Sequence, residues 1–101
     1  VALVAMLTRE ERVARTFAER TLGPLAADDE PTRRLARTLR VVLEEQGSPR
    51  RAGRRLGVHE NTVAKRLRSI QELGGPPAYG GRRAADVLAA LLILETLRAD
   101  S

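Results

Sequence analysis

The 101-residue chain has no cysteine and only one histidine, His59. Without cysteine it cannot form disulfides, thiolate nucleophiles, iron–sulfur clusters or cysteine-based zinc sites. A single histidine also leaves it without a histidine-rich metal site or a histidine pair for proton relay. We therefore expect a protein that is not an enzyme, with no catalytic residues, no metal and no cofactor.

Aromatic residues are almost as scarce, at 2% of the chain, with one Phe, one Tyr and no Trp. Recognition of single-stranded nucleic acid by stacking bases on aromatic rings is therefore not expected. Hydrophobic residues still reach 43%, which is enough for a core built from Leu, Val and Ala. Because Ala, Leu, Arg and Glu form helices better than strands, the composition predicts an all-α fold.

Long apolar runs are also missing. None approaches the roughly 18 uninterrupted apolar residues that span a membrane, and no basic leader precedes the apolar start. We expect a soluble, cytoplasmic protein with no membrane partner. Residues 1–7 are predicted to end a preceding helix or linker, and residues 8–101 to form one helical domain. Because the chain begins with Val, we expect it to be a piece of a longer protein.

About five helices are predicted from apolar spacing and from residues that begin and end helices. They cover residues 9–22, 31–46, 49–56, 60–73 and 82–98, with a glycine-rich loop over 74–81. Thr8 and Glu11 have the spacing of a capping box at the first helix. Val13, Ala14 and Phe17 are predicted to form the apolar stripe of that helix.

The last predicted helix is apolar around most of its circumference, through Val87, Leu88, Leu91, Leu92, Ile93, Leu94 and Leu97. A surface helix would show a narrower stripe. This helix is therefore either the central core helix or a helix that packs against a second chain, and both can hold. Leu88, Leu92 and Ile93 widen the apolar face beyond the needs of one small core, which predicts a homo-oligomeric parent protein.

Positive charge is concentrated in one third of the chain. Residues 1–47 carry eight basic and eight acidic residues, whereas residues 48–83 carry nine basic and two acidic residues, a net charge of +7. A solvated surface usually mixes both signs, so this excess indicates a polyanionic partner, with nucleic acid favoured over a membrane surface. The acidic residues 28–30 precede Pro31 and are interpreted as a helix start rather than a cation site.

The basic third has the spacing of a helix-turn-helix at residues 49–73. A short first helix meets Gly57, whose freedom at positive φ permits the turn, and a second helix follows over residues 60–73. Ala52 and Gly53 are small where the two helices would cross. Apolar anchors flank the turn on both sides, namely Leu56, Val58, Val63 and Leu67.

A helical wheel separates two faces of the second helix. Val63, Leu67 and Ile70 fall within about 60° of each other and are predicted to face the core. The opposite face is polar and suits the major groove, where Arg and Lys contact guanine and Asn contacts adenine. It carries Asn61, Lys65, Arg68 and Glu72, flanked by Thr62 and Ser69. Arg66 lies nearer the buried stripe, which predicts a phosphate contact or an intramolecular ion pair.

The stretch from Leu56 to Val63, with Arg66, Leu67, Ile70 and the Glu72–Gly74 end, resembles the C-terminal helix-turn-helix domain of the PucR family. These are bacterial transcription regulators related to CdaR-type sugar-diacid regulators. The resemblance implies a longer parent protein whose upstream sensor domain is missing here. This sequence departs from the family pattern at Gly53, where a second Ala is frequent. It also departs at Ala64 and Lys65, where a Tyr often precedes the Arg.

Double-stranded DNA is the partner that the motif, the charge and the resemblance together predict. The recognition helix would be residues 60–73, placed in the major groove. The candidate DNA-binding residues are Arg50, Arg51, Arg54, Arg55, His59, Asn61, Thr62, Lys65, Arg66, Arg68 and Ser69. The four arginines of the first helix are expected at phosphates, because that helix crosses the DNA backbone. His59 is equally consistent with a helix cap, and Asn61 and Thr62 are favoured as base contacts over caps.

Two alternative functions remain open at this point. The helix-turn-helix is also similar to that of the factor for inversion stimulation, which makes a nucleoid-type DNA-binding protein possible. The apolar last helix could instead dock another protein, in which case the domain would be an interaction or dimerisation module. Strong salt dependence of duplex binding would separate DNA binding from hydrophobic docking.

Overall fold

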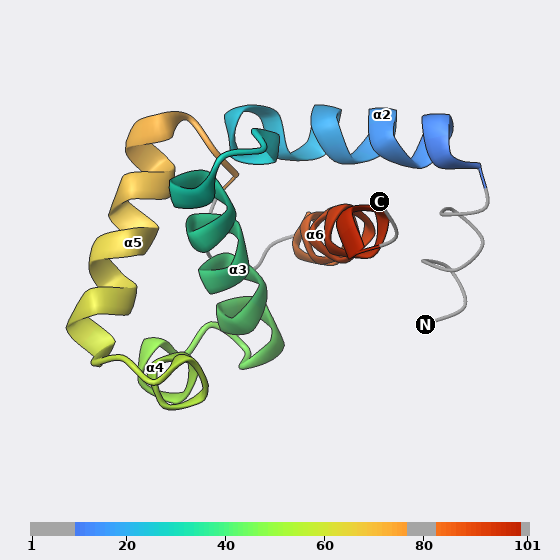
Figure 1. The fold of residues 1–101 in the computed structure, drawn as a ribbon. Coiled ribbons are helices and arrows are strands. Elements are labelled where there is room, and N and C mark those ends of the chain that lie inside the picture. The colour runs from blue at the N-terminus through green and yellow to red at the C-terminus, as the bar shows by residue number, and fades with distance from the viewer. Residues whose placement is uncertain (1–9, 77–82, 100–101) are drawn as a thin grey trace.

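The computed structural model describes residues 10–76 and 83–99, which form five α-helices, one 3-10 helix and no strand (Figure 1). In chain order these are α2 (Glu11–Leu22), η1 (Gly23–Ala26), α3 (Glu30–Glu44), α4 (Pro49–Leu56), α5 (Glu60–Leu73) and α6 (Ala84–Ala99). The predicted all-α fold is confirmed. Within the described ranges, no helix has both the length and the apolar character needed to cross a membrane.

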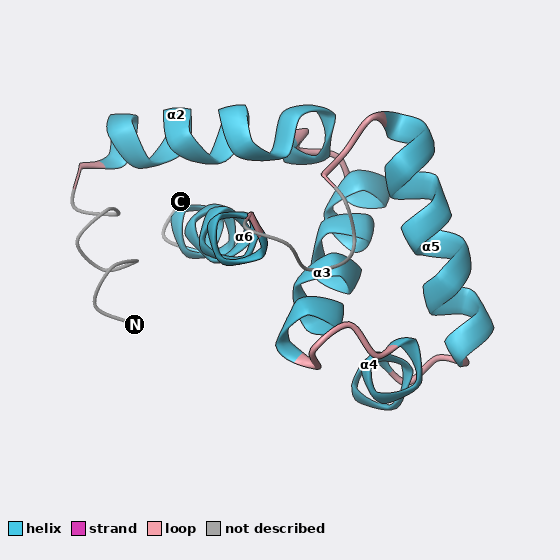
Figure 2. Cartoon of the chain, turned by 180° about the vertical axis from the view of Figure 1, so that it is seen from behind, coloured by secondary structure: helices cyan, strands magenta, loops and turns pink. Residues whose placement is uncertain are grey.

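Helix α3 lies between two parts of the fold. On one side α4 and α5 pack against it, and on the other side α6 packs against both α3 and α2, as the front and back views agree (Figures 1 and 2). The pair α4–α5 is therefore held at one end of the molecule, and the pair α2–α6 at the other. Because α3 contacts both pairs, it fixes the helix-turn-helix relative to the rest of the core.

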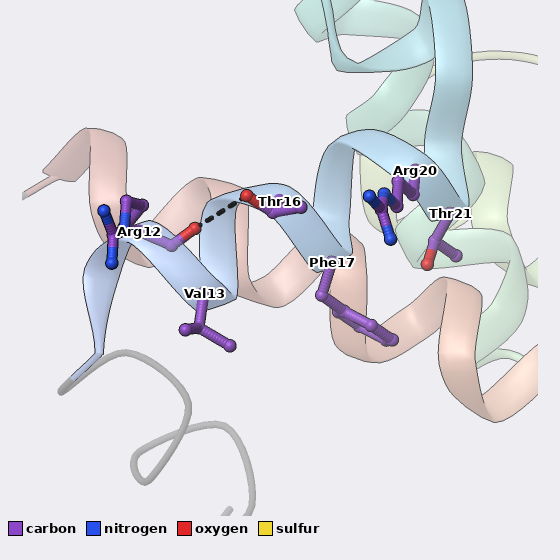
Figure 3. Close-up of a pocket in the computed structure, with 6 residues that line it drawn as sticks. All are labelled: Arg12, Val13, Thr16, Phe17, Arg20 and Thr21. Carbon is purple, nitrogen blue, oxygen red and sulfur yellow. Dashed lines mark hydrogen bonds between the residues drawn. The ribbon is translucent and has the colours of Figure 1, made fainter.

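Helix α2 packs on α6 through small side chains. Ala14 and Ala18 are fully buried, followed by Leu22, so the two helices approach closely. The predicted stripe was partly wrong, because Val13 is 55% exposed and Phe17 is only half-buried. Both side chains point to one side of α2, where they line an open hollow of about 420 Å³ (Figure 3).

The N-terminal start of α2 also differs from its prediction. The helix begins at Glu11, and its N-cap residue Glu10 makes no side-chain capping hydrogen bond. Thr8, the first residue of the expected capping box, lies outside the described residues, as do residues 1–7 and 77–82. At the other end Gly23 adopts a φ of 57° and ends the helix, as predicted.

The acidic residues before α3 are a helix start, as predicted. Asp29 is the N-cap, and its Oδ1 accepts a hydrogen bond from the Thr32 N–H at 2.9 Å. The helix ends at Glu44, two residues earlier than expected. Gln46 and Gly47 have φ values of 57° and 83°, which the right-handed helix cannot continue.

Helix α6 is the central core helix. Its apolar residues face both α2 and α3, so most of its circumference is covered. The expectation that Ile93 would be available to a second chain was wrong, because Ile93 is fully buried within this chain. Leu88 and Leu92 are half-buried. The breadth of the apolar face thus follows from packing between two helices.

The cap of α3 gives a prediction about acid stability. Hydrogen bonds from Thr32 hold the pKa of Asp29 below its ordinary value of 3.8. A carboxylate with a lowered folded-state pKa stabilises the protein fully above that ordinary value and loses its contribution as pH falls through the folded pKa. We expect Asp29→Asn to be less stable than the parent at about pH 6, and the difference to shrink below about pH 4.

Thermal unfolding of both proteins across this pH range tests the expectation. Asn also caps helices well, so the variant keeps the local fold while losing the titrating group. A constant stability difference at every pH would show that the Asp29 charge contributes nothing.

Candidate nucleic-acid interface

The helix-turn-helix has the predicted boundaries, with α4 at Pro49–Leu56 and α5 at Glu60–Leu73. Gly57 has the left-handed φ of 72° that the turn requires, and its N–H donates to the Gly53 carbonyl. The Val58 N–H donates to the same carbonyl at 2.9 Å. These bonds close α4 and turn the chain into α5.

The two helices meet most closely at Gly53. A Cβ atom added there would lie 2.6 Å from the carbonyl oxygen of Val58 and 3.4 Å from the backbone nitrogen of Glu60. The obstacle is backbone, which cannot move aside as a flexible side chain could. The departure from the family pattern at this position therefore has a physical reason in this chain.

Helix α5 separates a buried and an exposed face as the wheel predicted. Val63, Leu67 and Ile70 are buried in the core. The opposite side is exposed at Asn61, Lys65, Arg68, Ser69 and Glu72, and Thr62 on its flank is half-buried. Within the described part of the chain, neither Lys65 nor Arg68 has an ion-pair partner. This face therefore presents two unpaired cations, the Glu72 carboxylate and several neutral donors and acceptors to the solvent.

His59 caps α5. Its backbone is extended, and its Nδ1 accepts a hydrogen bond from the Asn61 N–H at 3.0 Å. Of the two roles considered for His59, the structure thus supports the cap. The side chains of Asn61 and Thr62 lie within the first turn and are not the N-cap, which leaves them available on the exposed side.

Arg66 ties α5 to α3. Its Nη1 donates to Thr38 Oγ1 at 3.3 Å, and the fully buried Thr38 hydroxyl in turn donates to the Arg34 carbonyl at 2.9 Å. This is a bond to a neutral group, and Arg66 forms no ion pair with any residue that the structure describes. A phosphate contact by Arg66 stays a prediction.

The four arginines of α4 fall into two rows, each with the i, i+4 spacing that places side chains on one face. Arg50 and Arg54 are exposed and have no ion-pair partner among the residues that the structure describes. Arg51 and Arg55 instead turn toward the end of α3. We therefore distinguish an outer row, Arg50 and Arg54, from an inner row, Arg51 and Arg55.

The inner row is paired with two carboxylates of α3 and its C-cap. Arg55 lies 3.0 Å from Glu44 and 3.1 Å from Glu45, and hydrogen bonds to Glu44 and then Glu45 raise the pKa of Arg55 further above its already high value. Arg51 lies 3.4 Å from a Glu45 carboxylate oxygen and donates to the Glu45 carbonyl at 2.9 Å. Both side chains are thus paired within the chain, although they stay partly exposed, at 53% for Arg51 and 44% for Arg55.

These pairs continue toward the core. Arg40 lies 2.8 Å from Glu44 on its own helix and 2.8 Å from Glu95 on α6. We call Arg40, Glu44, Glu45, Glu95 and the inner row the ion-pair network. It connects α6 with α4 through α3. The sequence did not predict that Glu44 and Glu45 pair with Arg51 and Arg55, because these arginines lie on a different helix. The i, i+4 spacing of Arg40 and Glu44 was the one available signal.

In the ranges that the structure describes, no group of three His, Asp or Glu side chains could hold a metal ion. The exposed side chains of α4 and α5 are mostly cations, amides and hydroxyls, with two carboxylates, Glu60 and Glu72. Such a set is suited to binding an anion.

Comparison with known proteins identifies the family. The model of the PucR C-terminal helix-turn-helix domain matches residues 35–93, more than half of the chain. This chain belongs to that family. Membership in the PucR family indicates a DNA-binding function in transcription regulation. Helix α2 lies outside the matched residues, although its buried face belongs to the same core.

A curated relative of the PucR-family chain is an uncharacterized protein in the pkwA 5′ region from Thermomonospora curvata. The two are 43% identical over 58 residues, which are 57% of this chain and 32% of the relative. The shared region thus spans about a third of that protein's length. No solved structure matches the chain, so the similarity to the factor for inversion stimulation remains a prediction.

The close approach at Gly53 can be tested by substitution. We expect Gly53→Ala to destabilise the domain by about 1–3 kcal/mol, because the added methyl group overpacks the helix crossing. Urea unfolding measures the effect. Arg54→Ala on the same helix is the control and should change stability by no more than about 0.5 kcal/mol, because its side chain is exposed. Equal stability of Gly53→Ala and the parent would mean that the crossing is loose.

Proposed function

We propose that this PucR-family domain binds double-stranded DNA in a sequence-specific way, with α5 in the major groove. The observation that supports this most strongly is the exposed face of α5, where Lys65 and Arg68 have no partner within the described structure. Unpaired cations on an exposed helix can bind an anion without first breaking an internal pair. The outer row, Arg50 and Arg54, adds two more such cations on the first helix of the same motif.

The proposed contacts divide by chemistry. Lys65 and Arg68 would contact guanine edges, and Asn61 would contact adenine, as these side chains do in the major groove. Thr62 and Ser69 would lie at the edges of this contact face of α5. Arg50 and Arg54 would contact phosphates, because the first helix of the motif crosses the backbone. His59 at the cap of α5, and Arg66, whose Nη1 bonds to Thr38 of α3, would each contact a phosphate.

Two observations favour this function over the alternatives. The apolar face of α6, which suggested a protein-docking module, is largely used by packing against α2 and α3. The family assignment favours a transcription regulator over a nucleoid-type protein. We further propose that the domain acts in the cytoplasm as part of a longer regulator with an upstream sensor domain.

Substitution of the exposed cations tests the proposed groove face. We expect Lys65→Ala and Arg68→Ala each to weaken binding to a preferred duplex, selected from random sequences, by about 1–3 kcal/mol. Circular dichroism should show unchanged helicity, since both side chains are exposed. Fluorescence anisotropy at fixed salt measures the affinity.

The matched control is Arg12→Ala, which removes one exposed positive charge from α2, on the far side of α3. It should bind nearly as tightly as the parent. If the two α5 variants bind as well as this control, then α5 does not present the contact face.

Symmetry of the selected sites gives a second test. One recognition helix contacts only a few base pairs, so specific helix-turn-helix proteins generally bind as dimers on half-sites about one helical turn apart. We expect the preferred DNA to be an inverted repeat that binds two chains, and this chain alone to dimerise weakly at most. Sedimentation equilibrium with and without the repeat measures the stoichiometry. One chain per duplex on asymmetric sites would argue against the dimer while leaving DNA binding in place.

A further inference from the structure

The two rows of arginines on α4 differ in what DNA binding would require of them. A phosphate can approach Arg50 or Arg54 directly, because neither has an ion-pair partner within the described residues. At Arg51 or Arg55, a phosphate must compete with carboxylate oxygens that already lie 3.0 to 3.4 Å from the guanidinium groups. Equal charge in the sequence therefore does not mean equal availability to DNA.

Glu44 and Glu45 are well placed to remain paired with Arg51 and Arg55. The side chains of Glu44 and Glu45 are only 28% and 24% exposed, so salt screens them less than it screens a fully exposed carboxylate. Arg55 is shared between both carboxylates, and Arg51 also donates to the Glu45 backbone carbonyl. A network with several charges and hydrogen bonds is also stronger than an isolated surface pair.

We infer that Glu44 and Glu45 hold Arg51 and Arg55 away from the DNA backbone and thereby limit the sequence-independent part of binding. This inference rests on the proposed function, because it specifies which cations of the same motif contact phosphates. Arg51 and Arg55 are positioning residues that join α4 to α3, and Arg50 and Arg54 carry the phosphate contacts of this helix.

The consequence for specificity follows from the chemistry of the two kinds of contact. Phosphate contacts strengthen binding to every sequence, whereas base contacts on α5 strengthen binding to the preferred one. Keeping two arginines paired with carboxylates of the same chain lowers affinity for unrelated DNA and leaves the base contacts unchanged. Glu44 and Glu45 would thus determine how far binding depends on sequence.

The test is the salt dependence of binding by Glu44→Gln/Glu45→Gln, measured on the selected duplex and on a random-sequence duplex. Each phosphate neutralised adds about 0.9 to the slope of log affinity against log salt concentration. Release of both arginines should steepen this slope by about 1.8. Between 50 and 200 mM salt, the affinity of the variant should therefore fall by a factor about 12 times larger than the affinity of the parent does. Affinity for the random duplex should rise at low salt.

The matched control is Glu11→Gln/Glu30→Gln. It also removes two carboxylates, but these pair with Arg15, Arg33 and Arg34 on α2 and α3 and not with α4. A steeper slope in the Glu44/Glu45 variant alone supports the inference. The same slope change in both variants would mean that net charge is the cause, and the inference would be wrong.

A second pair of variants keeps the inference testable if Glu44→Gln/Glu45→Gln does not fold. In the parent background, Arg51→Gln/Arg55→Gln should leave the salt slope unchanged, because these two arginines do not contact phosphates. Gln can still donate hydrogen bonds to Glu44 and Glu45, so α4 should stay in place. Arg50→Gln/Arg54→Gln should lower the slope by about 1.8. A fall of that size in the Arg51/Arg55 variant would overturn the inference, and a parent chain that binds no duplex at 50 mM salt would overturn the proposed function as well.

Discussion

The close backbone contact between Gly53 and Val58 is the constraint on which the proposed DNA-binding surface depends. With the carbonyl oxygen of Val58 only 2.6 Å from where a Cβ would stand, α4 and α5 cross at a distance that only glycine allows. The same crossing sets the angle between the outer row of α4 and the exposed face of α5. A side chain at this point would separate the helices and move the cations on one relative to those on the other.

Helix α3 transmits this arrangement to the rest of the domain. At its middle, the buried hydroxyl of Thr38 accepts the hydrogen bond from Arg66 of α5. At its end, Glu44 and Glu45 hold the inner row of α4. Since α3 also packs on α6, both helices of the motif are attached to one rigid support. Positioned side chains on regular helices make a more defined recognition surface than side chains on loops would.

Charge in the sequence and charge at the surface are different quantities in this protein. The segment 48–83 has a net charge of +7, and the preceding segment is neutral. In the folded chain, two carboxylates from the neutral segment pair with two arginines of the basic one. The positive field that a ligand meets is therefore weaker and more localised than the sequence count indicates. On α4 and α5, the exposed cations without an ion-pair partner among the described residues are Arg50, Arg54, Lys65 and Arg68.

The sequence by itself determined the helical fold, the bounds of α4 and α5, and the division of α5 into a core face and a polar face. These follow from local signals, since a left-handed glycine such as Gly57 and a 3.6-residue apolar period act within a few residues. Tertiary structure alone decided that Ile93 is buried, that Val13 is exposed and that Arg55 is paired with Glu44 and Glu45. Each of those outcomes depends on which helix lies opposite, and a helical period specifies a face without specifying its neighbour.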